Sequence, residues 1–266
     1  MKRFINSKSI PLLVLLSSVL AVLLRIWTRG GGPDEGGLFP RQRVAWILLW
    51  LLTFGVAAAI IYAVRCLKNP GHYRENYPKS LPAGLCAIPA ALCFLISGYQ
   101  QLRDSAALAL PGTTAVDTVT AIFALLAGLC LLLSVAHRCM GKKPYFLING
   151  LICLYLAVRL FNRCQIWSNQ PQMGLVVFPF LASTCLMLSA YQRVCFDVDL
   201  GKRPMAALWS LMSVYLCAVA IFSFEQPLFY GMCALWQMAD LCSMRPLKRK
   251  PKAEPKEAPE QPEAEA

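Results

Sequence analysis

Long runs of apolar residues, separated by short polar segments, dominate the pattern of this chain. A bilayer core about 30 Å thick is crossed by about 20 mostly apolar residues in an α-helix that rises 1.5 Å per residue. The pattern therefore predicts an all-α fold, a polytopic membrane helical bundle with about eight transmembrane helices. The runs that fit, each bounded by charge, Pro or Gly, are 10–27, 44–64, 82–100, 117–137, 145–161, 173–191, 205–223 and 227–243.

The first run raises the alternative of a cleaved signal peptide. Lys2 and Arg3 near the start of the chain precede it, and the Val-Leu-Ala segment at 19–21 could serve as a cleavage site. The apolar stretch continues through Leu24, which favours a helix that stays in the protein. Arg25, which ends this helix, could extend its charge to the membrane interface.

Lys and Arg are distributed unevenly among the segments between the runs. With eight spans, one side of the membrane receives 19 of the 26 basic residues and the other side receives 7. Because positively charged loops tend to remain cytoplasmic, this asymmetry predicts that the N- and C-termini are both cytoplasmic.

The chain divides into a transmembrane helical domain, residues 1–246, and a tail, residues 247–266. The tail is a low-complexity segment of Pro, Glu, Lys and Ala, and we predict that it is disordered in the cytoplasm. Basic residues beside the last run predict contact with anionic lipids at the cytoplasmic face, although such residues also act as stop-transfer anchors. They are Arg245, Lys248, Arg249, Lys250 and Lys252.

Composition narrows the class of protein further. Hydrophobic residues make up 57% of the 266 and charged residues 15%, and the mean hydropathy is +0.52. Water-soluble domains have about 45–50% apolar and about 25% charged residues, so the lipid bilayer is the expected surrounding. The net charge of +12 is dispersed among short segments, which is a topology signal, and no nucleic-acid partner is predicted.

An eight-residue motif occurs twice, 92 residues apart. Residues 93–100 read CFLISGYQ and residues 185–192 read CLMLSAYQ, with four identical positions. The copies lie three helices apart, so the third to fifth and the sixth to eighth helices are candidate inverted halves, an arrangement found in many transporters. The alternative is that two Leu-, Cys- and Ser-rich membrane helices share only their composition.

Ionisable residues inside a span cost a few kcal/mol at the bilayer centre and are functional candidates for that reason. Arg159 falls in the outer third of its predicted helix, and Arg163 shares its face. Asp117 and Glu225 lie at the outer ends of other spans, so either could pair with Arg159. Arginines that end the helix and extend to the interface are the alternative interpretation.

Asp240 lies in the inner third of the last predicted span. Three cations could neutralise it there: Arg138, Arg193 and Arg245. A structural ion pair and a proton or ion site are the two interpretations. The apolar runs also hold two amides that could hydrogen-bond between helices, Asn149 and Gln237.

The motifs of metal sites and of common enzymes are missing. The twelve cysteines include no Cys-x-x-Cys pair. Six of them fall within the interiors of apolar helices, where Cys packs as a small hydrophobe: Cys93, Cys130, Cys153, Cys185, Cys217 and Cys233. We therefore predict no metal and no cofactor. His-Glu-x-x-His, Gly-x-Ser-x-Gly and the P-loop lysine motif do not occur, which predicts a protein that is not an enzyme.

Three segments carry a resemblance to known proteins: RCQIWSNQPQ at 163–172, LMLSAYQRVCFD at 186–197 and QPLFY at 226–230. Through them the chain resembles a group of small, uncharacterised multi-pass membrane proteins of clostridial gut bacteria. The resemblance implies a bacterial cytoplasmic membrane, the inner membrane of the cell. It supplies no catalytic residues.

Two functional hypotheses follow. In the first, the chain is a non-enzymatic membrane protein whose outer cavity, near Arg159, Asp117 and Glu225, binds or transports a small solute. In the second, it is a membrane scaffold or accessory subunit that docks a protein partner, or a second copy, through helix faces. Polar residues that line a cavity would support the first hypothesis. Exposed helix faces made of small or apolar residues would support the second. A membrane enzyme that acts on lipid ranks last, because no nucleophile and base come together.

Overall fold

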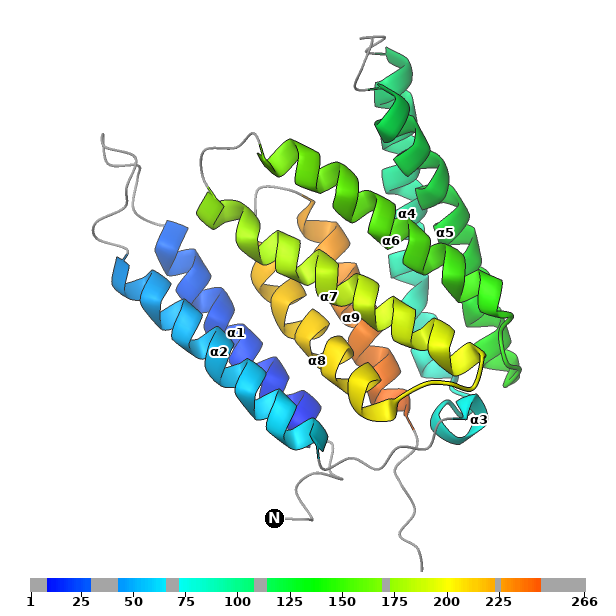
Figure 1. Cartoon of the computed structure of the whole chain (residues 1–266), viewed down its shortest axis with the longest axis horizontal. Coiled ribbons are helices and arrows are strands. Elements are labelled where there is room, and N and C mark those ends of the chain that lie inside the picture. The colour runs from blue at the N-terminus through cyan, green and yellow to red at the C-terminus, as the bar shows by residue number, and fades with distance from the viewer. Residues whose placement is uncertain are drawn as a thin grey trace, which may run out of the picture.

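The computed structural model describes residues 9–29, 43–65, 72–107, 114–168, 173–222 and 226–244. Within these ranges the fold is all α, as predicted, with eight long helices and one single-turn helix, α3 (Figure 1). The predicted tail, the basic residues from Arg245 to Lys252, and Glu225 lie outside the described residues. The helices are α1 (Ser9–Arg29), α2 (Arg43–Arg65), α3 (Tyr73–Asn76), α4 (Leu81–Ala107), α5 (Thr114–Met140), α6 (Phe146–Ser168), α7 (Met173–Asp197), α8 (Arg203–Ala220) and α9 (Pro227–Ser243).

Each predicted run corresponds to one long helix, and the differences are at the ends. The run predicted at 82–100 continues in α4 to Ala107, and the run at 145–161 continues in α6 to Ser168. A helix keeps its backbone hydrogen bonds when polar residues replace apolar ones, so it can extend beyond the hydrocarbon. The run at 205–223 is shorter than predicted, because α8 ends at Ala220.

Six of the long helices, α1, α2, α4, α5, α6 and α8, are long and apolar enough to cross a bilayer. The protein is therefore a membrane-embedded helical bundle. Of the two others, α9 has 17 residues and extends about 26 Å at 1.5 Å per residue, close to the thickness of the hydrocarbon core. The helix α7 has 25 residues and includes Pro179.

The helices α4 to α9 form a ring, because each packs against the next and α9 packs against α4. The hairpin of α1 and α2 packs against α8, on one side of this ring (Figure 1). In the span of α8, 67% of the residues are buried, against 22% in α1 and 28% in α2. The core of the protein therefore lies around α8, and the faces of α1 and α2 that point away from it are apolar and exposed, as lipid requires.

The helices α4 and α5 pack through small residues. A Cβ atom added at Gly98 would lie 2.9 Å from the Cβ of Ala124, and one added at Gly128 would lie 2.7 Å from the Cγ of Leu95. Small residues let membrane helices approach closely and gain van der Waals contact where the hydrophobic effect is missing. Buried alanines flank these glycines on both helices: Ala91 lies near Gly128, and Ala121 and Ala124 lie near Gly98.

The α1–α2 hairpin is attached to the ring partly through Arg25. This side chain is only 1% exposed, and its guanidinium lies 4.9 Å from the ring centre of Trp46 and 5.4 Å from that of Phe178. The prediction that Arg25 extends to the interface is therefore wrong. Aromatic faces attract a cation, and here rings from α2 and α7 surround it.

The two copies of the repeated motif place corresponding residues in similar surroundings. Ser97 and Ser189 are both buried, whereas Tyr99 and Tyr191 are 63% and 52% exposed. The two copies therefore use the same helix face toward the core. That α4–α6 and α7–α9 form an inverted repeat stays a prediction.

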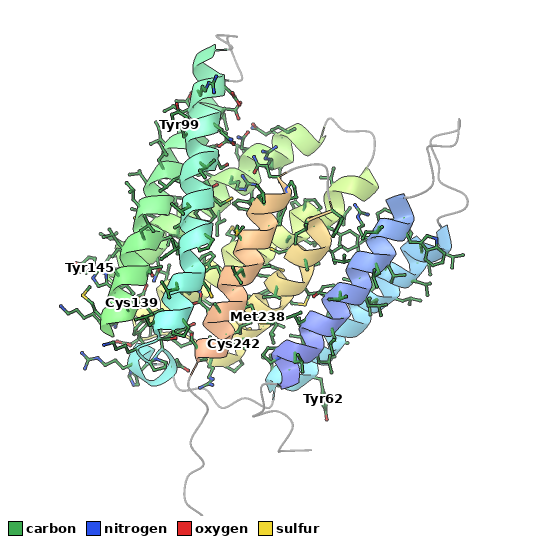
Figure 2. All side chains as sticks on the ribbon, turned by 180° about the vertical axis from the view of Figure 1, so that it is seen from behind. Tyr62, Tyr99, Cys139, Tyr145, Met238 and Cys242 are labelled. Atoms are coloured by element: carbon green, nitrogen blue, oxygen red, sulfur yellow. The ribbon has the colours of Figure 1, made fainter. Side chains whose placement is uncertain are left out.

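The two ends of the bundle differ in the residues they hold. Tyr99 lies at the end opposite Tyr62 and Cys242 (Figure 2), and we call these the Tyr99 end and the Tyr62 end. The helices α5 and α7 both finish at the Tyr62 end with a left-handed residue, Gly141 at φ 72° and Asp199 at φ 58°. In each turn the next residue donates its N–H to a carbonyl five residues earlier, which satisfies the helix end.

Asp199 joins these two turns to α3. Its carboxylate accepts hydrogen bonds from Lys143 Nζ at 2.5 Å and from the Tyr73 backbone N–H at 3.0 Å. The Lys143 hydrogen bond and then the Tyr73 hydrogen bond hold the pKa of Asp199 below its usual value.

We expect Asp199→Asn to lower stability slightly at neutral pH, by at most about 0.5 kcal/mol, because the Asp199 side chain is 41% exposed and solvent weakens the pair. Asn tolerates the left-handed conformation, so the variant removes only the charge. A group with a lowered pKa stabilises the fold above its unfolded pKa of about 4, and this contribution is lost as the pH falls through the folded pKa. Thermal unfolding in detergent should therefore separate the variant from wild type more at pH 7 than at pH 3. A difference that is larger at pH 3 would contradict this role.

Candidate functional site

Arg159 lies on α6, toward the Tyr99 end, and is 3% exposed. Its Nη2 donates a hydrogen bond to Oε1 of Gln226 at 2.7 Å, and its guanidinium carbon lies 3.7 Å from the ring centre of Phe229. Its Nε and Nη1 have no hydrogen-bond partner within the described residues. Arg159 is therefore a buried cation that retains two unused donor atoms. We call Arg159, Gln226 and Phe229 the Arg159 cluster.

The predicted pairing of Arg159 with Asp117 is wrong. Asn162, on the next turn of α6, donates its Nδ2 to Oδ1 of Asp117 at 2.8 Å and lies 3.3 Å from Oγ1 of Thr120. Residues three apart differ by about 60° around a helix. Asn162 therefore reaches α5 while Arg159 reaches α9. The predicted pairing with Glu225 lies outside the described residues.

Aromatic residues surround the Arg159 cluster. Phe94 of α4 contacts Phe229 and Tyr155, with ring centres 5.5 Å and 5.1 Å apart. The hydroxyl of Tyr155 is buried close to the Arg159 guanidinium, and that of Tyr230 lies 3.4 Å from Ser183 Oγ. A cation in such low-dielectric surroundings attracts anions more strongly than one in water.

The cavity that the structure describes is not at this cluster. It lies along α4 and is lined by other residues, as set out below. Phe229 of α9 covers one face of the Arg159 guanidinium. The predicted cavity near Arg159, Asp117 and Glu225 stays a prediction, because residues 223–225 lie outside the described residues.

Asp240 lies on α9 toward the Tyr62 end and is 2% exposed. It forms ion pairs with Arg138 of α5 and Arg193 of α7, whose side chains are 10% and 11% exposed. The prediction that these two arginines neutralise Asp240 is confirmed, and Arg245 lies outside the described residues. One carboxylate thus holds three helices together. We call these three residues the Asp240 cluster.

The surroundings of the Asp240 cluster supply aromatic faces and hydroxyl groups. Arg138 lies 5.2 Å from the ring centre of Tyr77 and donates a hydrogen bond to Ser243. Arg193 lies 4.5 Å from the ring centre of Trp236. Burial raises the pKa of Tyr73, whose phenol lies near Arg138, to about 12.

The two amides named from the sequence both hydrogen-bond between helices, as predicted. Asn149 donates to Oδ2 of Asp197 at 2.7 Å. Gln237 Oε1 accepts a hydrogen bond from Ser189 at 2.7 Å, and the same serine lies 2.9 Å from Ser210 Oγ. These bonds connect α7 to α6, to α9 and to α8. They are structural contacts of the kind that polar residues make in membrane bundles.

The partner that Arg159 has in the structure, Gln226, was not predicted from the sequence. Gln226 is in the left-handed conformation at φ 48° and precedes Pro227, which begins α9. The Gln-Pro pair at this helix start was the available signal, since Pro is favoured at the first position of a helix. The left-handed conformation of Gln226 could not be predicted, because no local sequence pattern indicates it.

Within the described residues, no three His, Cys, Asp or Glu side chains come together as metal ligands would. The chain matches no protein-family model, no curated protein and no solved structure.

Proposed function

We propose that this chain is a non-enzymatic protein of a bacterial cytoplasmic membrane that binds or transports a small anionic solute at the Arg159 cluster. In this proposal all eight long helices cross the bilayer, both termini are cytoplasmic, and the Tyr99 end faces outward. The Lys and Arg asymmetry between the loops supports the orientation.

The observation that carries the proposal is that, among the residues that the structure describes, Arg159 lacks partners for Nε and Nη1. A buried charge is normally paired and hydrogen-bonded, because an unpaired one is costly in a low-dielectric region. Asp240 and its two arginines are paired by charge, whereas in the described part of the chain Arg159 contacts only neutral groups: Gln226, the Tyr155 hydroxyl and the ring of Phe229. An anion at Nε and Nη1 would complete the bonding of this cation.

Thermal unfolding of the purified protein in detergent tests this proposal with acetate, benzoate, succinate and inorganic phosphate as probes. At ten times its dissociation constant, a bound anion stabilises the protein by about 1.4 kcal/mol. We expect at least one probe to raise the Tm of the wild type by about 3 °C. We expect the same probe to leave Arg159→Leu unchanged.

Arg163→Leu is the matched control, because this arginine lies one turn further along the same face of α6. It should keep the response to the anion. The proposal is wrong if none of the four anions stabilises the wild type, or if Arg159→Leu responds as strongly as Arg163→Leu.

A second candidate function is a scaffold that docks another membrane helix, from a partner or from a second copy. The observation in its favour is on α2, where Gly55 and Ala59 are both exposed one turn apart and no atom lies within 4 Å of a Cβ added at Gly55. Spacing of small residues by four is typical of membrane helix pairs. A Gly55→Leu variant that changes the oligomeric state in native mass spectrometry would favour this function.

A further inference from the structure

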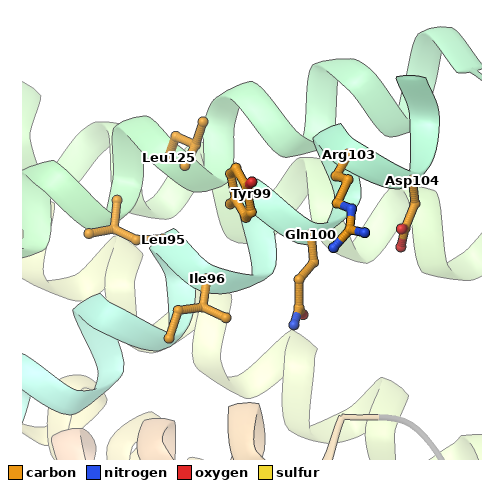
Figure 3. A pocket seen from close by; sticks show the side chains of 7 residues that line it. All are labelled: Leu95, Ile96, Tyr99, Gln100, Arg103, Asp104 and Leu125. Carbon is orange, nitrogen blue, oxygen red and sulfur yellow. The ribbon is translucent and has the colours of Figure 1, made fainter. Parts of the chain in front are cut away.

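The described cavity lies on α4 and has a volume of about 660 Å³, within the range of small-molecule sites (Figure 3). Six of its seven lining residues come from the last part of α4, and Leu125 of α5 completes it. The lining residues are Leu95, Ile96, Tyr99, Gln100, Arg103, Asp104 and Leu125.

The cavity changes in chemical character along its length. Leu95, Ile96 and Leu125 are apolar, whereas Arg103 and Asp104 are charged. Leu95 and Asp104 lie nine residues apart on one helix, which is about 14 Å, or roughly half of the hydrocarbon core. The candidate membrane span of α4 ends at Asp104. The apolar part is therefore at the depth of acyl chains, and the charged part is at the depth of lipid headgroups.

The charges at this cavity are available to a ligand. Arg103 and Asp104 are both exposed, and neither forms an ion pair within the described ranges. The side chains of Ile96, Gln100 and Arg103 turn to the same side of α4 (Figure 3). A cation and an anion in adjacent positions complement a molecule that itself carries both charges.

We propose that this cavity binds a phospholipid whose headgroup carries a phosphate and a primary ammonium, as phosphatidylethanolamine does. Arg103 donates hydrogen bonds to the phosphate, and the Asp104 carboxylate accepts them from the ammonium. Gln100 and the Tyr99 hydroxyl donate to the ester carbonyls. One acyl chain lies along Leu95, Ile96 and Leu125.

Photo-crosslinking tests this proposal with the full chain in nanodiscs. Two probes carry the same diazirine-labelled acyl chain, one on phosphatidylethanolamine and one on phosphatidylglycerol, which has the phosphate but no ammonium. We expect crosslinks at residues 95–104 of α4 and near Leu125, with a yield at least threefold higher for phosphatidylethanolamine. Crosslinks spread equally over the exposed leucines of α1 and α2, without dependence on the headgroup, would overturn the proposal.

Variants separate the roles of the two charges. Arg103→Gln should lower the yield of both probes at least threefold, whereas Asp104→Asn should remove only the preference for phosphatidylethanolamine. Ile96→Trp, which fills the apolar part, should lower both yields. Lys142→Gln, at the far end of α5, is the control and should change neither. If Asp104→Asn keeps the preference, the assigned recognition of the ammonium is wrong.

Discussion

Asp240→Asn should lower the free energy of unfolding by about 3–5 kcal/mol, since removing one member of a buried ion cluster leaves the others uncompensated. Two guanidiniums, those of Arg138 and Arg193, depend on this carboxylate, and each is at most about one-tenth exposed. Asn has the same shape as Asp, so the loss reports charge and not volume. Reversible unfolding in mixed detergent micelles measures the difference.

A triple variant distinguishes an electrostatic cause from a disturbed core. In this variant Arg138, Arg193 and Asp240 are all replaced by Leu, which removes all three charges. Well-packed apolar residues often replace buried ion clusters without loss of stability. We expect this variant to regain most of the stability that Asp240→Asn loses. If Asp240→Asn changes the unfolding free energy by less than about 1 kcal/mol, well below the range for a broken buried pair, the Asp240 cluster does not hold the three helices together.

Gly98→Leu is expected to have the second large effect, because it forces α4 away from α5. The added Cβ alone would lie 2.9 Å from the Cβ of Ala124 and 3.0 Å from the carbonyl oxygen of Ala121. Neither atom belongs to the flexible end of a side chain, so the helices themselves must separate. Overpacking typically costs about 1–3 kcal/mol, and we expect about 3 kcal/mol or more for a four-carbon side chain here. The same unfolding experiment measures it.

Gly150→Leu is the matched control, because no atom lies within 4 Å of a Cβ added at Gly150 on α6. Gly is about 1 kcal/mol less favourable than Ala in a helix, and Leu is close to Ala. This control should therefore be neutral or slightly stabilising. Equal losses for Gly98→Leu and Gly150→Leu would contradict the close approach of α4 and α5.

The helices could be predicted from the sequence because each span of a bilayer needs about 20 mostly apolar residues. The run at 44–64 matches α2, Arg43–Arg65, to within one residue at each end. The short helix α3 was missed, since four residues are too few to show periodicity. The end of α4 was missed because its polar last residues, beyond the predicted span, read as a loop.

The two polar clusters differ in how far they could be predicted. The partners of Asp240 could be named, since only a few basic residues lie at the correct depth on neighbouring helices. The partner of Arg159 could not, because Gln226 reaches it only through a left-handed backbone at the start of α9. Depth along a helix follows from counting residues, but the direction of a connecting turn does not.

The α4 cavity was not foreseen for a related reason. Its residues on this helix lie at positions 95, 96, 99, 100, 103 and 104, which share one side of a helix. That spacing is readable in the sequence, but whether another helix covers this side depends on the packing. Only the structure shows that α4 meets α5 and α9 and leaves this strip uncovered.

The central claim, that all eight long helices cross the membrane, is tested most directly by the accessibility of single cysteines. Lys142→Cys, Leu200→Cys and Phe222→Cys, each in a cysteine-free background, are treated with an impermeant maleimide in intact cells and after permeabilisation. These residues follow α5, α7 and α8. We predict that Phe222→Cys is labelled in intact cells, and that Lys142→Cys and Leu200→Cys are labelled only after permeabilisation. Labelling of Leu200→Cys in intact cells together with Phe222→Cys would contradict the eight-span account.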